Sequence, residues 1–435
     1  MKPATPSSGV VARPALTLSF FATGFVSLFL VLCWIGIRPE TLMGSYYQPA
    51  LLALVHAVVL GWLGSIFIGA AYQLGPVIAE RSLRWPCLGW VNLGLHLGGF
   101  PIMVHGFGSG DYHWVLIGGS CVSAGFLLFI VAQVGTASSR WRADAVGCSL
   151  VIAWFWLAIT LAIGLYMAWS RVQGVGMAPS PWLRAHAIVG LIGFFLTVFN
   201  AVSLRLVPMF AVTEVQSKGR IWGSLIVTQI GLQIVTPGVL SMNSIFNWTA
   251  ALLLFVGQSL FVWEIVAQLL RRHRKLDAPL KWFVLSVAWL PAALAGLLLL
   301  LVRLPWNFIN LDPAQGAVLV VAVFLAGCLT TAILGMSFKI VPFLVWQGAY
   351  ARHLGRRRTP MLSDLVSPIL FRVSVIFTNG GTVGLVVALA LQSSDVLRWT
   401  AFSFAVGLLA VMVNYAMALK HFWKPRLETL QRSLS

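Results

Sequence analysis

The chain has 435 residues, of which 59% are hydrophobic and only 9% are charged. A soluble domain carries charged side chains at roughly a quarter of its positions, so this composition excludes a soluble globular enzyme. The formal charge of +18 comes mainly from short loops beside apolar runs. This is the orientation signal of a membrane protein, and we expect no binding to nucleic acid.

Twelve apolar runs follow one another along the chain, and each is long enough to cross a bilayer as a helix, which takes about 20 residues. They predict an all-α polytopic membrane protein. We expect a single transmembrane domain that covers residues 1–435, in contact with membrane lipid, with residues 421–435 as a cytoplasmic tail. The runs lie roughly at 15–37, 49–75, 85–108, 113–135, 146–170, 182–210, 221–240, 247–270, 280–303, 314–345, 367–391 and 397–420.

The basic residues of the loops indicate the orientation. Twelve spans place both termini on one side, and the loops and tails of that side carry 21 Lys and Arg residues. Because positively charged loops stay in the cytoplasm, both termini are predicted to be cytoplasmic, as in a bacterial inner-membrane protein. The other side has five basic residues, which are Arg38, Arg171, Arg184, Arg303 and Arg398.

Spans 2, 6 and 10 share a sequence pattern. The segments GWLGSIFIGAAYQLGP, GFFLTVFNAVSLRLVP and GCLTTAILGMSFKIVP end at Pro76, Pro208 and Pro342, and each begins with Gly. Each also has a small residue eight positions after that Gly and a polar residue three before the proline. The near-constant period of four spans predicts a pseudo-threefold 4+4+4 arrangement, with repeats at roughly 15–135, 146–270 and 280–420. We expect the prolines to break their helices at the cytoplasmic side.

The eight histidines fall into two groups. Those in basic loops or in the tail are predicted to be solvated or in contact with lipid headgroups, and they are His273, His353 and His421. The other five lie in or beside spans, where an ionisable residue is costly and indicates function. Neutral imidazole is also a ligand of haem iron and of copper. These five are His56, His96, His105, His113 and His186.

Helix geometry limits how these histidines can pair. His56 is the first candidate haem ligand, and its partner is left open. His96 or His105 could face it from span 3, but nine residues separate them, so they point to opposite sides of that helix. His186 is a second candidate ligand of haem or metal. The alternative for His56 is a buried histidine that donates to a helix carbonyl, and the alternative for His186 is an interfacial residue.

The twelve helices in groups of four, with both ends inside, resemble subunit I of the haem-copper oxidases. The segment LVHAVVLGWLGSIFIGAAYQLGPV resembles the second helix of that family, whose histidine ligates the low-spin haem, and His56 matches it. The segment RAHAIVGLIGFFLTVFNAVSLRLVPMF resembles the sixth helix, whose histidine ligates copper, and His186 matches it. The resemblance implies haem b, with copper as a further possible cofactor. It places Arg184 and Arg303 where the haem propionates are bound in the family.

The chain also departs from the family pattern. Span 10 contains no histidine, and Ala322 occupies the position equivalent to His56; span 7 contains none either. Glu264 is the only acidic residue well inside a span. We therefore do not expect a complete proton-pumping oxygen reductase. The closer resemblance is to the NnrS-like branch of haem- and copper-containing membrane proteins, which are associated with nitric oxide stress.

Two functions follow from the sequence. The first is a haem-binding integral membrane redox protein that transfers electrons or responds to nitric oxide or metal stress, with a redox partner at the outer face. Such a protein need not be an enzyme; if it is one, we expect a membrane oxidoreductase related to cytochrome c oxidase subunit I. The alternative is a cofactor-free membrane transporter of metal or haem that uses the same histidines.

Overall fold

The computed structural model describes residues 14–137, 144–175, 179–306, 309–354 and 356–425. In these ranges it has twelve helices long and apolar enough to cross a membrane, and no β-strand. This confirms the predicted all-α polytopic membrane protein. Most of the predicted tail, residues 426–435, lies outside the described residues.

The spans follow one another with short connections, and three of them consist of two α-helices joined by a π-helix. Short 3₁₀ turns lie in the loops, at η1 (Pro39–Leu42), η6 (Ala351–His353), η7 (Leu362–Leu365) and η8 (Lys420–Phe422). The spans in chain order are α1 (Pro14–Ile37), α2–η2–α3 (Pro49–His56, Ala57–Gly64, Ser65–Ala79), α4 (Pro86–Ser109), α5 (Tyr112–Thr136), α7 (Ala145–Val172), α8–η3–α9 (Pro179–Ile188, Val189–Leu196, Thr197–Ala211), α10 (Lys218–Leu240), α11 (Ser244–Leu270), α12 (Ala278–Leu301), α13–η5–α14 (Pro313–Ala322, Val323–Thr330, Thr331–Tyr350), α15 (Pro368–Ala390) and α16 (Ser394–Leu419).

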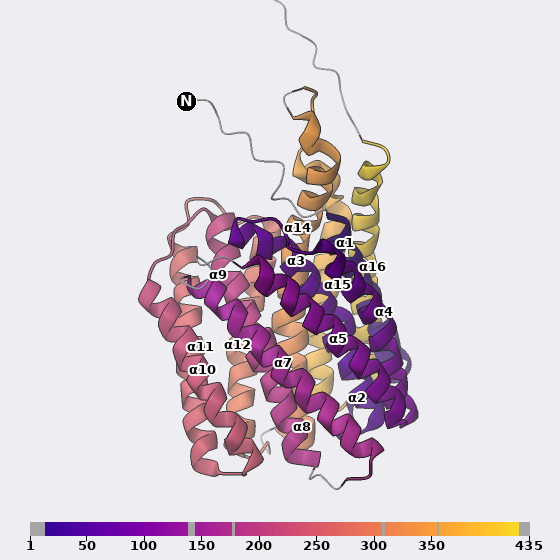
Figure 1. The fold of residues 1–435 in the computed structure, drawn as a ribbon, viewed down its shortest axis with the longest axis vertical. Coiled ribbons are helices and arrows are strands. Elements are labelled where there is room, and N and C mark those ends of the chain that lie inside the picture. Colours follow the sequence, from indigo (N-terminus) through magenta and orange to yellow (C-terminus); the bar gives the residue numbers. More distant parts are fainter. Residues whose placement is uncertain (1–13, 138–143, 176–178, 307–308, 355, 426–435) are drawn as a thin grey trace, which may run out of the picture.

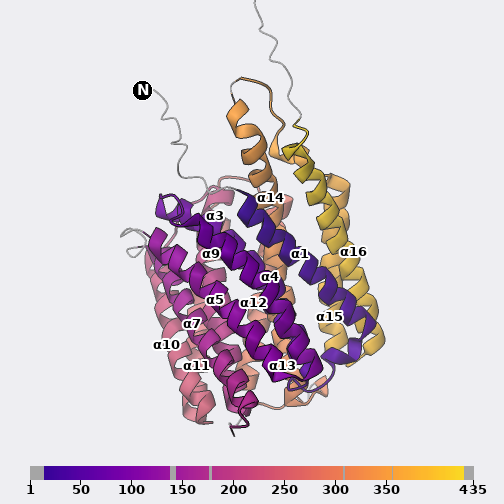
Figure 2. The ribbon, with the colours of Figure 1, turned by 45° about the vertical axis from the view of Figure 1, so that its right-hand side comes forward.

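The helices run along one common direction in a bundle (Figure 1). Helix α1 begins and α16 ends at the same end of this bundle, which we call the terminal end; the opposite end is the distal end (Figure 1). The first and last spans, α1 and α16, pack against each other, so the two ends of the sequence are neighbours in the bundle (Figure 2).

The three π-helices occupy equal places in spans 2, 6 and 10. Each has eight residues and begins at the same distance before the shared proline. A π-helix is rare and wide, and it leaves backbone carbonyls in need of donors. The hydroxyls of Thr197 and Thr331, which directly follow their π-helices, donate to the carbonyls of Ile192 and Ala326 at 3.1 Å. The residue at the same place in span 2 is Ser65.

The helix pairing also has a period of four spans. Hairpins α4–α5, α10–α11 and α15–α16 are the most extensively packed pairs in the described part of the chain. Each turns at the distal end through one residue of positive φ, followed by a side chain that caps the second helix. The three turns are Gly110–Asp111, Met242–Asn243 and Gln392–Ser393. These elements agree with the predicted threefold repeat, which stays a prediction.

The shared prolines lie inside their helices. Helices α3 and α9 continue past Pro76 and Pro208 for one short stretch and then end at Ala79 and Ala211. Helix α14 instead runs through Pro342 to Tyr350 and rises beyond the other spans at the terminal end (Figure 1). The expectation that Pro342 breaks its span was wrong, because the longer helix finds packing partners there.

Those partners come from the end of α16 and from the segment before α15. Val345 and Tyr350 of α14 pack with Leu365 and Ala418 in a separate apolar cluster. The Tyr350 hydroxyl and His421 Nδ1 are hydrogen-bonded at 2.5 Å, and His421 is 8% exposed. The prediction of a solvated His421 was therefore wrong.

Candidate functional site

A large apolar cavity lies inside the bundle toward the distal end. Its volume is about 1240 Å³, which is above the range of roughly 300–1,000 Å³ typical of small-molecule sites. Leucine, valine and isoleucine side chains of spans 1, 2, 5, 6, 9 and 10 supply most of its wall. All three π-helices border it, so the widened turns of spans 2, 6 and 10 shape the cavity.

His56 enters this cavity from the last turn of α2, directly before η2. Its Nδ1 lies 2.7 Å from the carbonyl oxygen of Leu52. A carbonyl only accepts hydrogen bonds, so Nδ1 carries the proton and Nε2 keeps its lone pair. The ring also stacks on Phe107 of α4, with 4.6 Å between ring centres. Both contacts fix the imidazole with a free ligand nitrogen.

His186 faces His56 from α8. The two ring centres are 6.3 Å apart, and the ring planes are inclined by 24°. Nδ1 of His186 is buried without a hydrogen-bond partner, and the ring lies directly against Gly164 of α7. The sequence left the partner of His56 open, although one signal was present. Each histidine is the eighth residue of a helix that begins with proline and runs inward from the distal end, so both reach the same depth.

The separation of the two ring centres is that of two imidazoles sharing one metal ion, although the rings are stacked here and would have to turn their nitrogens toward the ion. A metal–imidazole bond is about 2.0 Å long, so two imidazoles on opposite sides of one ion have ring centres roughly 6 Å apart. Among the described residues, no group of three or more His, Cys, Asp and Glu side chains is placed to hold a metal. Haem would need only two imidazoles from the protein, because the porphyrin supplies the remaining ligands. Haem therefore fits this pair, and the pair is the part of the structure that would hold it.

Arginine side chains stand at the distal mouth of the same cavity. Arg184 and Arg303 both border it, and Arg184 donates to the Ser180 hydroxyl at 2.9 Å. Tyr46, in the loop before α2, lies beside them. Burial and a hydrogen bond with Tyr47 raise the pKa of Tyr46, although Arg184 opposes the rise. The lining thus carries two positive charges, a protonated phenol and the carboxylate of Asp312, and this net positive charge suits the carboxylates of an amphiphilic ligand.

The structure does not bring the other candidate histidines to this cavity. His96 is 1% exposed and is bonded to the Ser65 hydroxyl at 2.9 Å through Nε2, among phenylalanine rings. His105 is exposed on the outer surface of α4. His113 is exposed and lies 3.2 Å from Asp111 at the start of α5. The geometry thus places His186 opposite His56, and neither His96 nor His105.

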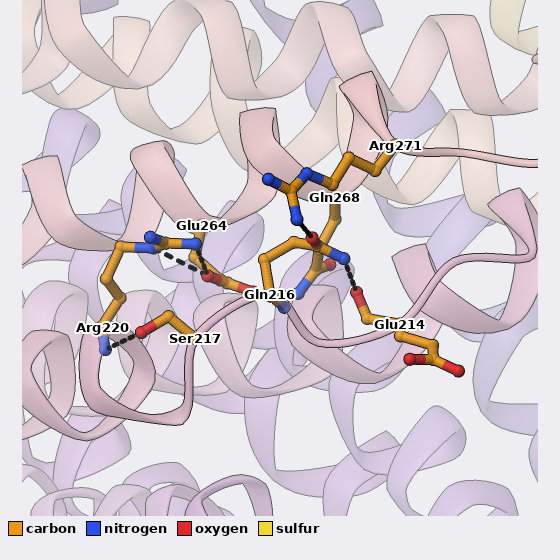
Figure 3. Close-up of polar contacts among 7 residues, drawn as sticks. All are labelled: Glu214, Gln216, Ser217, Arg220, Glu264, Gln268 and Arg271. Carbon is orange, nitrogen blue, oxygen red and sulfur yellow. Dashed lines mark hydrogen bonds and ion pairs between the residues drawn. The ribbon is translucent and has the colours of Figure 1, made fainter.

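A second buried polar cluster lies at the terminal end, around Glu264 of α11. Both carboxylate oxygens are fully used (Figure 3): one accepts from the Gln216 backbone and the Gln268 amide, and the other accepts twice from the Arg220 guanidinium at 2.8 and 2.9 Å. Gln216 in turn accepts from Arg271 at 2.9 Å. This cluster ties the loop before α10 to α11, and it leaves no carboxylate oxygen for a ligand.

No protein-family model matches the chain. The curated proteins contain no match to it either. The function of the cavity is therefore inferred from its own residues.

Proposed function

We propose that the chain is a haem-binding integral membrane redox protein in which His56 and His186 would hold one b-type haem. The observation that carries the proposal is the pair of imidazoles with ring centres 6.3 Å apart inside an apolar cavity. An ionisable group in the membrane interior is costly and is retained for function. Here two such groups face each other, with a free Nε2 on His56 and an unpartnered Nδ1 on His186.

The other residues have roles that follow from their positions. Leu52 fixes the tautomer of His56, and Gly164 leaves room for the ring of His186. Arg184 and Arg303 at the mouth bind the haem carboxylates, and the apolar wall keeps water away. Haem bound in this way supplies one-electron chemistry. If both imidazoles held the haem, no position on the iron would remain open for oxygen, so the proposal is electron transfer and not oxygen reduction.

The wider assignment is to the haem-copper oxidase subunit I superfamily, in a branch resembling NnrS-like proteins. It is supported by twelve spans, by three π-helices at equal places and by a helix pairing that repeats every four spans. Copper is the further cofactor that the same two imidazoles could take. A response to nitric oxide or metal stress is the physiological role that this resemblance implies.

The terminal end is proposed to face the cytoplasm of a bacterial cell. The excess of Lys and Arg in the loops and tails of that side supports this orientation. The cavity mouth then opens toward the outer face, where a redox partner protein would approach. Both histidines lie seven residues from the start of their helices, roughly 10 Å below that face.

The decisive experiment is a reduced-minus-oxidised absorption spectrum of the purified protein, with metal analysis of the same sample. We expect a Soret band and a sharp alpha band, and we expect His56→Ala and His186→Ala each to abolish the low-spin signal. A haem-free protein after expression with ample haem would overturn the proposal and favour the cofactor-free transporter of metal or haem. An unchanged spectrum in either variant would overturn the ligand assignment alone.

A further inference from the structure

Five exposed cations follow the ends of spans 10 and 12, at the terminal end of the bundle. They are Arg356, Arg357, Arg358, Lys420 and Lys424, and we call them the basic surface. Asp364 is an acidic residue of the same loop, and it already accepts a hydrogen bond from the Met361 backbone at 2.9 Å. The basic surface therefore keeps a net positive charge.

The three arginines lie in a loop that folds back along α14. The backbone N–H groups of Arg356 and Arg357 both donate to the carbonyl oxygen of His353 at 3.0 Å, which turns the chain after η6. The indole Nε1 of Trp346 then donates to the carbonyl oxygen of Pro360 at 2.9 Å. Because Trp346 lies before the last turn of α14, this bond shows that the loop returns toward the spans.

The two lysines are held at the same end of α14 by η8. The Phe422 ring lies directly against Gly348 of α14, and the Tyr350 hydroxyl is hydrogen-bonded to His421. The lysines stand on either side of this segment in the sequence. The end of α14 thus brings together cations that are far apart along the chain.

Exposed apolar side chains accompany the cations. Trp423, between the two lysines, is 77% exposed, and Met361, just after the arginines, is 71% exposed. Tryptophan next to basic residues is typical of the headgroup region of a membrane. Only η7 and a short link separate Met361 from Ile369, which is 70% exposed in the first turn of α15. Apolar surface therefore accompanies the chain from a span to the arginines.

Other cations at the terminal end are used within the fold. Arg220 pairs with Glu264 at 2.8 Å, and Lys339 pairs with Asp277. Within the described part of the chain, no charged group of the basic surface forms an ion pair or a hydrogen bond with another side chain. Its charge therefore contributes little to holding the spans together, and it is free to bind an anion.

We propose that the basic surface binds the headgroup of an anionic phospholipid, whose acyl chains lie along the exposed side of α15. A cluster of four to eight Lys and Arg residues next to a span attracts anionic lipids, and guanidinium groups bind phosphate oxygens in pairs. A second copy of the chain is disfavoured, because 29 basic residues against 11 acidic ones make two copies repel each other. An acidic soluble protein is disfavoured by the apolar surface that continues onto a span. The proposal is independent of haem.

Native mass spectrometry of the detergent-purified full chain tests this proposal, because it counts bound lipid molecules and reports the oligomeric state. Phosphatidylglycerol and phosphatidylcholine are titrated separately into the wild-type protein. We expect the first phosphatidylglycerol to bind about tenfold more tightly, since only its headgroup carries a net negative charge. A phosphatidylglycerol with a photoreactive headgroup should label residues 356–362 and 420–425 several-fold more than the loop at 271–281.

Two triple variants locate the effect. The combined change of Arg356, Arg357 and Arg358 to Gln should remove most of the preference for phosphatidylglycerol. The matched control removes three exposed cations from another loop of the terminal end and should keep the preference; it changes Arg274, Lys275 and Lys281 to Gln. The lipid comparison and the labelling in the wild-type protein stand even if a variant does not fold.

Three results would overturn the proposal. Equal affinity for the two lipids would leave the surface to an acidic soluble partner. Equal loss of the preference in both triple variants would reduce the effect to general charge. A dimer that the first triple variant dissociates would make a second copy of the chain the occupant.

Discussion

The two ends of the bundle each bury a cluster of ionisable side chains, and the ionisable groups differ in how completely the protein bonds them. At the terminal end, the carboxylate of Glu264 accepts four hydrogen bonds from Arg220, Gln216 and Gln268. Toward the distal end, His56 and His186 face each other and keep ring nitrogens without protein partners. Burial of a polar group is common to both. In the proposed site the titratable imidazoles themselves keep unused bonding capacity, whereas in the Glu264 cluster only the amide oxygen of Gln268 does.

The largest effect is expected from removal of one imidazole without disturbance of the fold. His186→Gly should lose the low-spin spectrum completely, and added imidazole should restore it, because the cavity reaches the distal end and can admit the free ligand. Absorption spectra with increasing imidazole measure this. His96→Gly is the matched control, because His96 does not line the cavity, and this variant should keep its spectrum without imidazole. Failure of imidazole to restore any signal in a folded protein would argue against His186 as a ligand.

Substitutions in the polar cluster around Glu264 should lower the thermal stability of the protein and leave its absorption spectrum unchanged. Arg220→Gln leaves the buried carboxylate of Glu264 without its ion-pair partner, which should cost about 3 kcal/mol. Thermal unfolding in detergent should show a clearly lower midpoint, with the absorption spectrum of the folded protein unchanged. Arg274→Gln, at an exposed position of the same end, should leave the midpoint where it is. A changed absorption spectrum in Arg220→Gln would contradict the interpretation that this cluster has only a structural role.

The space beside the His186 ring can be tested by substitution of Gly164. A Cβ at Gly164 would come within 3.0 Å of the His186 ring, so Gly164→Val should displace the imidazole at a cost of about 1–3 kcal/mol. We expect reduced haem content and a partly high-spin spectrum. Gly98→Val is the control, because nothing lies within 4 Å of a Cβ there. Equal haem content in both variants would contradict the placement of His186.

The smallest effect is expected at the cavity mouth. Arg184→Gln and Arg303→Gln should each weaken haem binding about tenfold, the equivalent of roughly 1.4 kcal/mol for one charged contact. Titration of haem into the haem-free protein measures this. Arg171→Gln is the control, since that guanidinium lies over Tyr112, away from the cavity. Unchanged haem affinity in both variants would show that Arg184 and Arg303 do not contribute to haem binding.

Sequence reasoning found the candidate residues more readily than their arrangement. His56 and His186 are candidates from the sequence because ionisable side chains are conspicuous in apolar spans, and the family resemblance adds Arg184 and Arg303. The pairing of His56 with His186 was not predicted, since spans 2 and 6 are far apart along the chain and only the packed bundle brings them together. His96 looked equivalent to the others from its position, yet its surroundings are entirely different.

The extension of α14 shows the same limit. Proline reduces helix stability locally, and from sequence Pro342 was expected to end its span. Whether the helix continues depends on contacts with Leu365 and Ala418, and the contact between Tyr350 and His421 joins residues far apart along the chain. Local propensity could not predict a helix that is held in place by tertiary packing.

The sequence by itself determined the helical membrane architecture, the number of spans and the period of the shared pattern. These properties follow from hydropathy and local spacing, because each span must satisfy its own backbone in lipid whatever its neighbours are. Tertiary structure alone decided which polar side chains meet. Whether a buried group is bonded by the protein, as Glu264 is, or keeps free capacity, as His56 and His186 do, depends on contacts between spans that no local pattern encodes.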